Sequence, residues 1–121
     1  MSDHHVVHVE FSAQDREAAT KFYSDLFGWK FQQFPEMDYA TFDTGKEVGG
    51  GLNPVSDTYP AGAVVVYIGS DDIDADLAKA ESLGAKILQP KTEIPNTGWF
   101  GFFADPTGNM IGLLSYIEQE F

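Results

Sequence analysis

The sequence predicts an α+β domain made of two similar strand–helix–strand–strand–strand (βαβββ) units. Short segments rich in Val, Ile and Phe alternate apolar and polar residues, which is typical of half-buried strands. Two longer segments repeat apolar residues every three to four positions, which is typical of amphipathic helices. The pattern also restarts once, near residue 63, and this indicates an internal repeat.

The first half contains one helix and four strands. A strand over Val6–Ser12 precedes a helix over Asp15–Phe27, which we expect Ser12 or Asp15 to cap and Gly28 to end in a left-handed conformation. Its predicted apolar rows are Ala18, Phe22 and Leu26, with Ala19, Tyr23 and Phe27 beside them. Turn residues separate three further strands, over Trp29–Phe34, Tyr39–Thr44 and Glu47–Asn53.

The second half repeats this order after a link over Pro54–Gly62. An apolar strand over Ala63–Ile68 leads to a helix over Asp72–Leu83, which Asp71 is placed to cap and Gly84 to end. Ile73, Leu77 and Ala80 should face inward. Three strands complete the half, over Lys86–Leu88, Gly98–Ala104 and Asn109–Tyr116.

Aligning the two halves predicts which side chains share a face of the sheet. The alignment matches Leu26–Phe31 with Ser82–Ile87, and the same offset pairs Asp15 with Asp71 and His8 with Val64. Since strand side chains alternate between faces, one set should pack under the helices: Val7, Val9, Phe11, Val65 and Tyr67. The opposite face should carry His8, Glu10, Val64 and Val66.

Composition narrows the class of protein. A chain of 121 residues with 43% hydrophobic residues has the size of a single domain, here residues 1–121. The absence of cysteine excludes disulfides, thiolate metal sites and a cysteine nucleophile. A net charge of −12 disfavours nucleic acid as a partner, and no segment has the length of a membrane span. The N-terminus lacks the pattern of a secretory signal, so we expect a cytoplasmic protein.

Several motifs, in order over nearly the whole chain, resemble the glyoxalase/bleomycin resistance/dioxygenase superfamily, also called the vicinal oxygen chelate (VOC) superfamily. They are His8–Phe11, Phe22–Trp29, Asp72–Asp74, Leu83–Ala85, Ile94–Phe100 and Asp105–Asn109. The closest resemblance is to the small glyoxalase-like proteins. It implies two βαβββ modules, about 5–53 and 63–117, whose curved mixed sheets form a cup around a ligand. It also implies a homodimer.

In metal-dependent members of this superfamily, four side chains from the first and last strand of each module hold a divalent metal. Carried over by position, the four places are His8, Gly51, Val64 and Gly112. A one-residue slip in the second module would place Val65 or Val66 there instead. Only His8 could bind a metal, so three of the four usual ligands are missing, and one imidazole does not hold a catalytic metal well. A site made by His8, Glu10 and atoms of a ligand remains an alternative.

His8 and Glu10 are the candidate catalytic residues. They lie two positions apart on one strand face, where Glu10 could raise the basicity of His8. The alternative is a polar pair without catalytic function, either hydrated on an exposed sheet face or satisfied at a dimer contact. We predict that the ligand pocket is lined by Gly51, Val64, Val66, Trp99, Met110, Gly112 and Tyr116. For the aromatic cluster that contains Trp99, a place in the core is the first interpretation, and a wall that stacks on a flat ligand is the second.

Three functions are compatible with these residues. The first is an enzyme of this superfamily, a lyase, isomerase or dioxygenase acting on a small oxygenated metabolite, with His8 and Glu10 as the polar centre. The second is a metal-free protein of the bleomycin resistance type that binds and sequesters a cationic drug or metabolite, which the net charge of −12 would favour. The third is a structural module that has lost its ligand.

Overall fold

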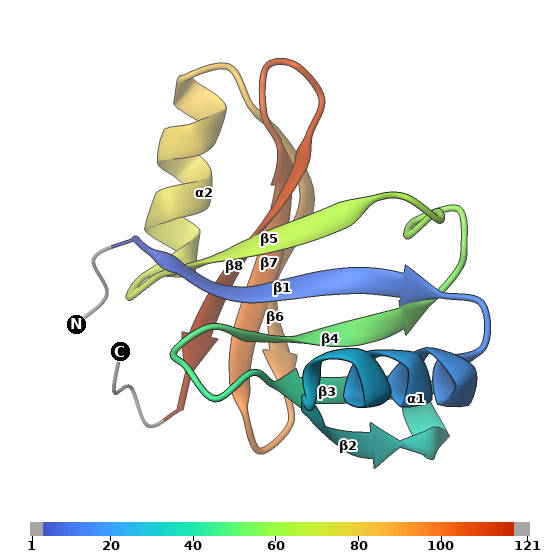
Figure 1. The fold of residues 1–121 in the computed structure, drawn as a ribbon. Helices are drawn as coiled ribbons and strands as arrows, with labels where there is room; N and C mark the ends of the chain where they lie inside the picture. Colours follow the sequence, from blue (N-terminus) through green and yellow to red (C-terminus); the bar gives the residue numbers. More distant parts are fainter. Residues whose placement is uncertain (1–3, 118–121) are drawn as a thin grey trace. The chain divides into compact units, whose positions relative to one another are not determined.

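A computed structural model describes residues 4–117 and confirms the α+β class with paired βαβββ units (Figure 1). Residues 1–3 and 118–121, which the sequence assigned to the same domain, lie outside the described residues. Two compact units are present, residues 8–65 and residues 66–117 together with residues 4–7, so their boundaries fall within β1 and β5. No helix in residues 4–117 is long and apolar enough to cross a membrane.

The unit of residues 8–65 has the strand order β2-β3-β4-β1. Only β1 and β4 run parallel; the other neighbours are antiparallel. A short 3₁₀ helix, which the sequence did not predict, connects β2 and β3. The elements are β1 (Val6–Ala13), α1 (Arg16–Phe27), β2 (Lys30–Phe34), η1 (Pro35–Met37), β3 (Tyr39–Asp43) and β4 (Gly49–Pro54).

Aromatic rings attach α1 to its sheet. Tyr23 of α1 lies 5.9 Å from the ring of Phe11 on β1 and stacks on Trp29 at 5.5 Å. Trp29 in turn stacks on Phe42 of β3 at 4.6 Å, and Phe42 is buried. This confirms that Phe11 lies on the helix side of β1, so that His8 and Glu10 face the other side.

The ends of α1 agree with the prediction, whereas its two predicted apolar rows are only partly buried. Asp15 caps the helix by accepting a hydrogen bond from the backbone of Ala18, and Gly28 ends it with a φ of +74°. Phe22 and Leu26 of the first row and Phe27 of the second are each 58% exposed. Apolar residues occupy more of this helix than one packing stripe needs, so periodicity alone could not decide which row is buried.

The unit of residues 66–117 has the equivalent strand order β5-β8-β7-β6, with β5 and β8 parallel. Ile73 and Leu77 of α2 form its buried core with Leu113 of β8. The elements are β5 (Val64–Gly69), α2 (Ile73–Ser82), β6 (Lys86–Ile94), β7 (Gly98–Ala104) and β8 (Met110–Tyr116).

Strand β6 extends to Ile94, although the sequence predicted that it would end at Leu88. Pro90 lies inside it, where the pairing with β7 shifts register between Gln89 and Thr92. Because β6 is an edge strand of this sheet, a proline there removes no hydrogen bond to a second neighbour.

The predicted faces of β5 are reversed in the structure. Ile68 packs against the core below α2, and its partner across the parallel pair is Leu113. By alternation Val64 and Val66 share the side of Ile68, whereas Tyr67 faces away from α2. Strand β5 was therefore predicted one residue out of register, and such a slip moves every side chain of a strand to the other face.

The error comes from the helix ends. Asp72, not Asp71, caps α2 by accepting a hydrogen bond from the backbone of Ala75, as Asp15 caps α1. The first halves of the two modules therefore match with an offset of 57 residues, from Asp15 to Asp72, whereas Gly28 and Gly84 match with 56. The alignment of the glycines displaced the first strand by one residue.

The buried core below α2 provides a test of this packing. Leu77 is 4% exposed, whereas Leu83, at the end of the same helix, is 71% exposed. We expect Leu77→Ala to lower the free energy of unfolding by about 2–5 kcal/mol, because it leaves a cavity. The matched control Leu83→Ala should change it by no more than about 0.5 kcal/mol. Urea unfolding followed by circular dichroism measures both; equal losses would contradict the packing described.

Candidate active site

A cluster of polar side chains lies on the face of β1 that points away from α1. His8 and Glu10 come from β1, as predicted, and their nearest polar atoms, His8 Nε2 and Glu10 Oε2, are 3.4 Å apart. Both side chains are largely buried, with 16% of His8 and 8% of Glu10 exposed. The pair is therefore not a hydrated pair on an open sheet face.

Tyr39, at the start of β3, connects the two predicted residues. Its hydroxyl donates a hydrogen bond to Glu10 Oε2 at 2.8 Å and lies 3.0 Å from His8 Nε2. Since the one hydroxyl proton is directed to Glu10, the contact with His8 requires that Nε2 carries a proton and donates it to the Tyr39 oxygen. Asn53 of β4 donates from its amide to Glu10 Oε1 at 2.7 Å.

Gly51 makes room for this arrangement. It lies opposite Glu10 in the parallel pair of β1 and β4 and opposite Thr41 in the pair of β4 and β3. A Cβ atom added to Gly51 would lie 1.9 Å from the Tyr39 hydroxyl oxygen. Any side chain at this position would displace the phenol. Gly51 was predicted to line a ligand pocket; the structure places it behind Tyr39.

Glu10 is a buried anion held by hydrogen bonds. Burial alone would raise the pKa of its carboxyl group, but hydrogen bonds from His8, Asn53 and Tyr39 and the attraction of His8 outweigh this effect, so that the pKa is lowered. Such a carboxylate is a weak proton acceptor. The geometry therefore suits Glu10 to an electrostatic and orienting role.

Tyr59 belongs to the surroundings of this centre. The Ser12 hydroxyl, two residues beyond Glu10 on β1, donates a 2.8 Å hydrogen bond to the Tyr59 carbonyl oxygen. Burial, together with the charge of Glu10, raises the pKa of Tyr59. Its phenol therefore stays protonated at neutral pH and can serve as a hydrogen-bond donor.

The residues of this centre do not fit the divalent metal that the family implies. The position for an acid on the last strand is Gly51, and the Tyr39 hydroxyl occupies the space in front of it. Both oxygens of Glu10 already accept hydrogen bonds from Tyr39 and Asn53. Within residues 4–117 no group of three or more His, Asp or Glu side chains is arranged to hold a metal ion.

Tyr39 and Asn53 were missed by the sequence reasoning. Both lie at the ends of predicted strands, but the sequence contains no signal for the register of β3 against β4. The register in which Ala40 of β3 pairs with Leu52 of β4 brings Tyr39 and Asn53 to Glu10. A polar residue placed two positions beyond Gly51 on the same strand, as Asn53 is, was the one available hint.

In the unit of residues 66–117, the predicted pocket residues divide between the two sheet faces. Gly112 pairs with Tyr67, and a Cβ added to it would lie 2.4 Å from the Tyr67 ring. Met110 and Tyr116 share the side of Gly112 by alternation. Burial raises the pKa of Tyr116.

The remaining predicted pocket residues lie on the other side. Trp99 packs against the core below α2, which was the first interpretation of its aromatic cluster, and Lys91 Nζ lies 5.2 Å from its ring centroid. Val64 and Val66 share that side of β5 with Ile68, and Val64 is 52% exposed. These three residues do not share the face that carries Gly112 and Tyr67.

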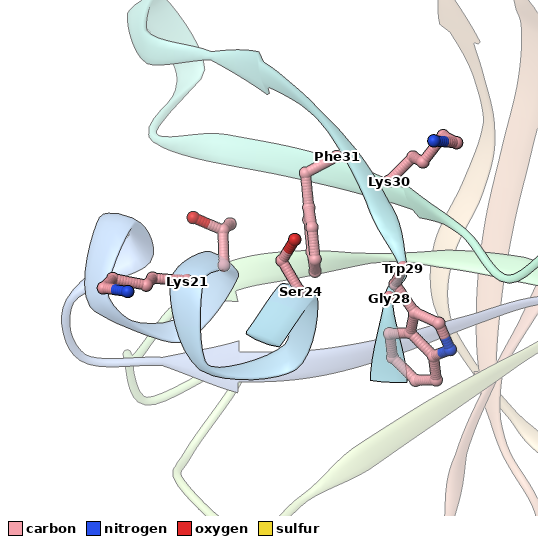
Figure 2. A pocket seen from close by; sticks show the side chains of 7 residues that line it. Lys21, Ser24, Gly28, Trp29, Lys30 and Phe31 are labelled. Carbon is pink, nitrogen blue, oxygen red and sulfur yellow. The ribbon is translucent and has the colours of Figure 1, made fainter. Parts of the chain in front are cut away.

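A separate surface depression of about 390 Å³ lies where α1 leads into β2. In Figure 2, the Phe31 ring faces Ser24 of α1, while Lys21 points away along the helix. Its lining contains none of the polar residues around Glu10; it consists of Thr20, Lys21, Ser24, Gly28, Trp29, Lys30 and Phe31.

The lowered pKa of Glu10 predicts a pH dependence of stability. A carboxyl group whose pKa is lower in the folded state stabilises the fold above its unfolded pKa, and this contribution disappears as the pH falls through the folded pKa. We expect Glu10→Gln to lower the free energy of unfolding at pH 7 by about 1–3 kcal/mol. The difference from the wild type should shrink below about pH 4.

Urea unfolding at a series of pH values measures this effect, with the exposed Glu47→Gln as control. A difference between Glu10→Gln and the wild type that stays constant down to about pH 2 would contradict an ionised, stabilised Glu10.

The poor fit to a divalent metal gives a second prediction. We expect elemental analysis of untagged protein to find no stoichiometric Ni, Zn, Mn, Fe or Co. Added ions should shift the melting temperatures of the wild type and of His8→Ala equally, since no His8-dependent site would bind them. Stoichiometric metal, or a stabilisation that is lost in His8→Ala, would show that the centre does hold a metal.

Comparison with known proteins identifies the family to which this chain belongs. Residues 5–113 match the model of the Glyoxalase/Bleomycin resistance protein/Dioxygenase superfamily. A Mycobacterium bovis protein named "Putative glyoxylase CFP32" is 31% identical over 112 residues, covering 87% of this chain and 43% of its own length. The chain thus spans less than half of the curated relatives that match it first.

Two further relatives are matched over most of their length. A "Glyoxylase-like domain-containing protein" of Didymella fabae is 34% identical over 109 residues, covering 84% of this chain and 85% of its own. A solved structure of a Streptomyces coelicolor methylmalonyl-CoA epimerase variant, bound to 2-nitronate-propionyl-CoA, has the same fold with a TM-score of 0.71. It is 19% identical and covers 98% of each chain. The chain belongs to the glyoxalase/bleomycin resistance protein/dioxygenase superfamily.

Proposed function

We propose that this chain binds a small oxygen-bearing molecule against the sheet face that carries His8, Tyr39 and Glu10, and that His8 is the residue that exchanges a proton with it. The buried hydrogen-bond network around Glu10 is the observation that supports this function. No metal ion takes part in this function, because the residues of the network do not fit one.

A buried carboxylate is costly, and the fold itself does not require one. Transferring a charged group out of water destabilises a protein unless hydrogen bonds compensate. In the second module the position equivalent to Glu10 is Tyr67, which packs on Phe102 with ring centroids 5.7 Å apart. The same place in the fold can thus be filled by an apolar ring, so a functional reason accounts best for Glu10.

The charge of the centre limits the class of ligand. Glu10 is held as an anion, and the whole chain carries a net charge of −12. Both disfavour an anionic group beside Glu10 and favour a neutral or cationic one. The His8 imidazole and the Tyr39 hydroxyl are suited to hydroxyl groups, which donate and accept hydrogen bonds, and to carbonyl groups, which accept them.

Two functions remain for such a site. In an isomerase or lyase, His8 would remove a proton next to a carbonyl group through Nδ1, the nitrogen without a proton when Nε2 carries one, while Tyr39 and Glu10 hold the imidazole in place. In the alternative, a metal-free binding protein would sequester a cationic molecule, which the anionic Glu10 favours. The names of the glyoxylase relatives support the first, and the weak basicity of Glu10 supports the second. A homodimer and a cytoplasmic location stay predictions.

Ligand-observed NMR with small hydroxy and carbonyl compounds tests the proposal. We expect neutral or cationic compounds to bind the wild type and His8→Ala to bind them at least about tenfold more weakly, as expected for a lost hydrogen bond to a charged or polar group. The exposed His5→Ala is the matched control and should bind as the wild type does. Equal binding by His8→Ala would contradict a site at this face.

The same samples in D₂O separate the two functions. Deuterium entering next to the carbonyl group with the wild type, but not with His8→Ala, would identify an enzyme that transfers protons. Binding without any exchange would identify a sequestering protein. Tighter binding of anionic compounds than of cationic compounds with the same scaffold would contradict the charge argument.

A further inference from the structure

The Tyr39 hydroxyl lies between the two residues on which the proposed function rests. It accepts a hydrogen bond from His8 Nε2 at 3.0 Å and donates one to Glu10 Oε2 at 2.8 Å. The direct contact of His8 with Glu10 is longer, at 3.4 Å. The phenol oxygen thus gives both side chains a better hydrogen-bond partner than either gives the other.

The place of this hydroxyl depends on Gly51. The hydroxyl lies against the backbone of β4, where a Cβ atom on Gly51 would be 1.9 Å from the oxygen and 2.3 Å from the Tyr39 ring carbon Cζ. Real Cβ contacts do not reach such distances, so an alanine at position 51 would force the phenol to move. Tyr39 and Gly51 therefore act as a pair whose members come from different strands.

We propose that Tyr39, held over Gly51, is the positioning residue of this centre: its hydroxyl fixes the orientation of both the His8 imidazole and the Glu10 carboxylate. This assignment deepens the proposed function and rests on it. Tyr39 acts through its two neighbours. The Tyr39 oxygen accepts a hydrogen bond from His8 Nε2, and the Tyr39 hydroxyl donates one to Glu10, so both side chains are oriented before any ligand arrives.

Two tyrosines interact with Glu10, so the effect of the Tyr39 hydrogen bond can be compared with the effect of a second phenol nearby. Within residues 8–65, the titratable groups that interact with Glu10 include His8 from β1, Tyr39 from β3 and Tyr59 from the segment after β4. Tyr39 lowers the pKa of Glu10 through a hydrogen bond, whereas the charge of Glu10 acts on the pKa of Tyr59. Tyr59→Phe is therefore a matched control for Tyr39→Phe.

The experiment is a pH titration of the Glu10 carboxyl group in ligand-free protein, followed by carbon NMR of protein labelled at the glutamate side-chain carboxyls. Glu10→Gln assigns the signal. We expect the midpoint of Glu10 to rise by about one pH unit in Tyr39→Phe, the roughly tenfold change in proton affinity that the loss of one hydrogen bond to a charged group produces. Tyr59→Phe should leave the midpoint near that of the wild type.

Gly51→Ala provides a second variant, since it keeps the hydroxyl but displaces it, and it should raise the midpoint as Tyr39→Phe does. If Gly51→Ala does not fold, Tyr39→Phe decides alone, because it removes only one oxygen atom. An unchanged midpoint in Tyr39→Phe, or an equal rise in Tyr59→Phe, would overturn the assignment. No ligand is present, so a failure here is distinct from a failure of the proposed binding function.

Discussion

The buried negative charge of Glu10 is the constraint on which the arrangement of the first module depends. A carboxylate that is 8% exposed must obtain from the protein the hydrogen bonds that water would otherwise supply. Neighbouring strands meet this need: β3 contributes a hydrogen bond from Tyr39 and β4 one from Asn53, while His8 of β1 lies 3.4 Å from the carboxylate. The hydrogen bonds outweigh the effect of burial on the pKa, so the charge is a stable part of the native state.

In both modules the first and last strand pair in parallel, and a glycine of the last strand lies beside a side chain of the first strand. The side chain that fills the space above this glycine differs between the modules. In one module Glu10 lies beside Gly51, and the space above the glycine holds the Tyr39 hydroxyl. In the other, Tyr67 lies beside Gly112 and its own ring fills the corresponding space. The repeat therefore preserves a backbone geometry, while the side chains make one face polar and the equivalent face of the other module aromatic.

Membership of the superfamily establishes the fold of this chain, and its own residues decide the chemistry. The family model covers residues 5–113, yet the place of an acidic ligand on the last strand of the first module is taken by a glycine and a phenol. Binding sites are determined by a few side chains on a shared scaffold, so the same modules can serve different reactions. Here hydrogen bonds link His8, Tyr39 and Glu10 into one buried network.

The sequence by itself determined the two βαβββ units, nearly every strand, the end of the first helix at Gly28, and the shared face of His8 and Glu10. These features depend on local periodicity and turn chemistry, which neighbouring residues encode. Only the tertiary structure decided the faces of β5 and the contact of Tyr39 with Glu10. Side chains alternate with a period of two, so a one-residue difference between the repeats reversed a face. The register that brings β3 to β1 through β4 is a long-range property, which no local pattern in the sequence encodes.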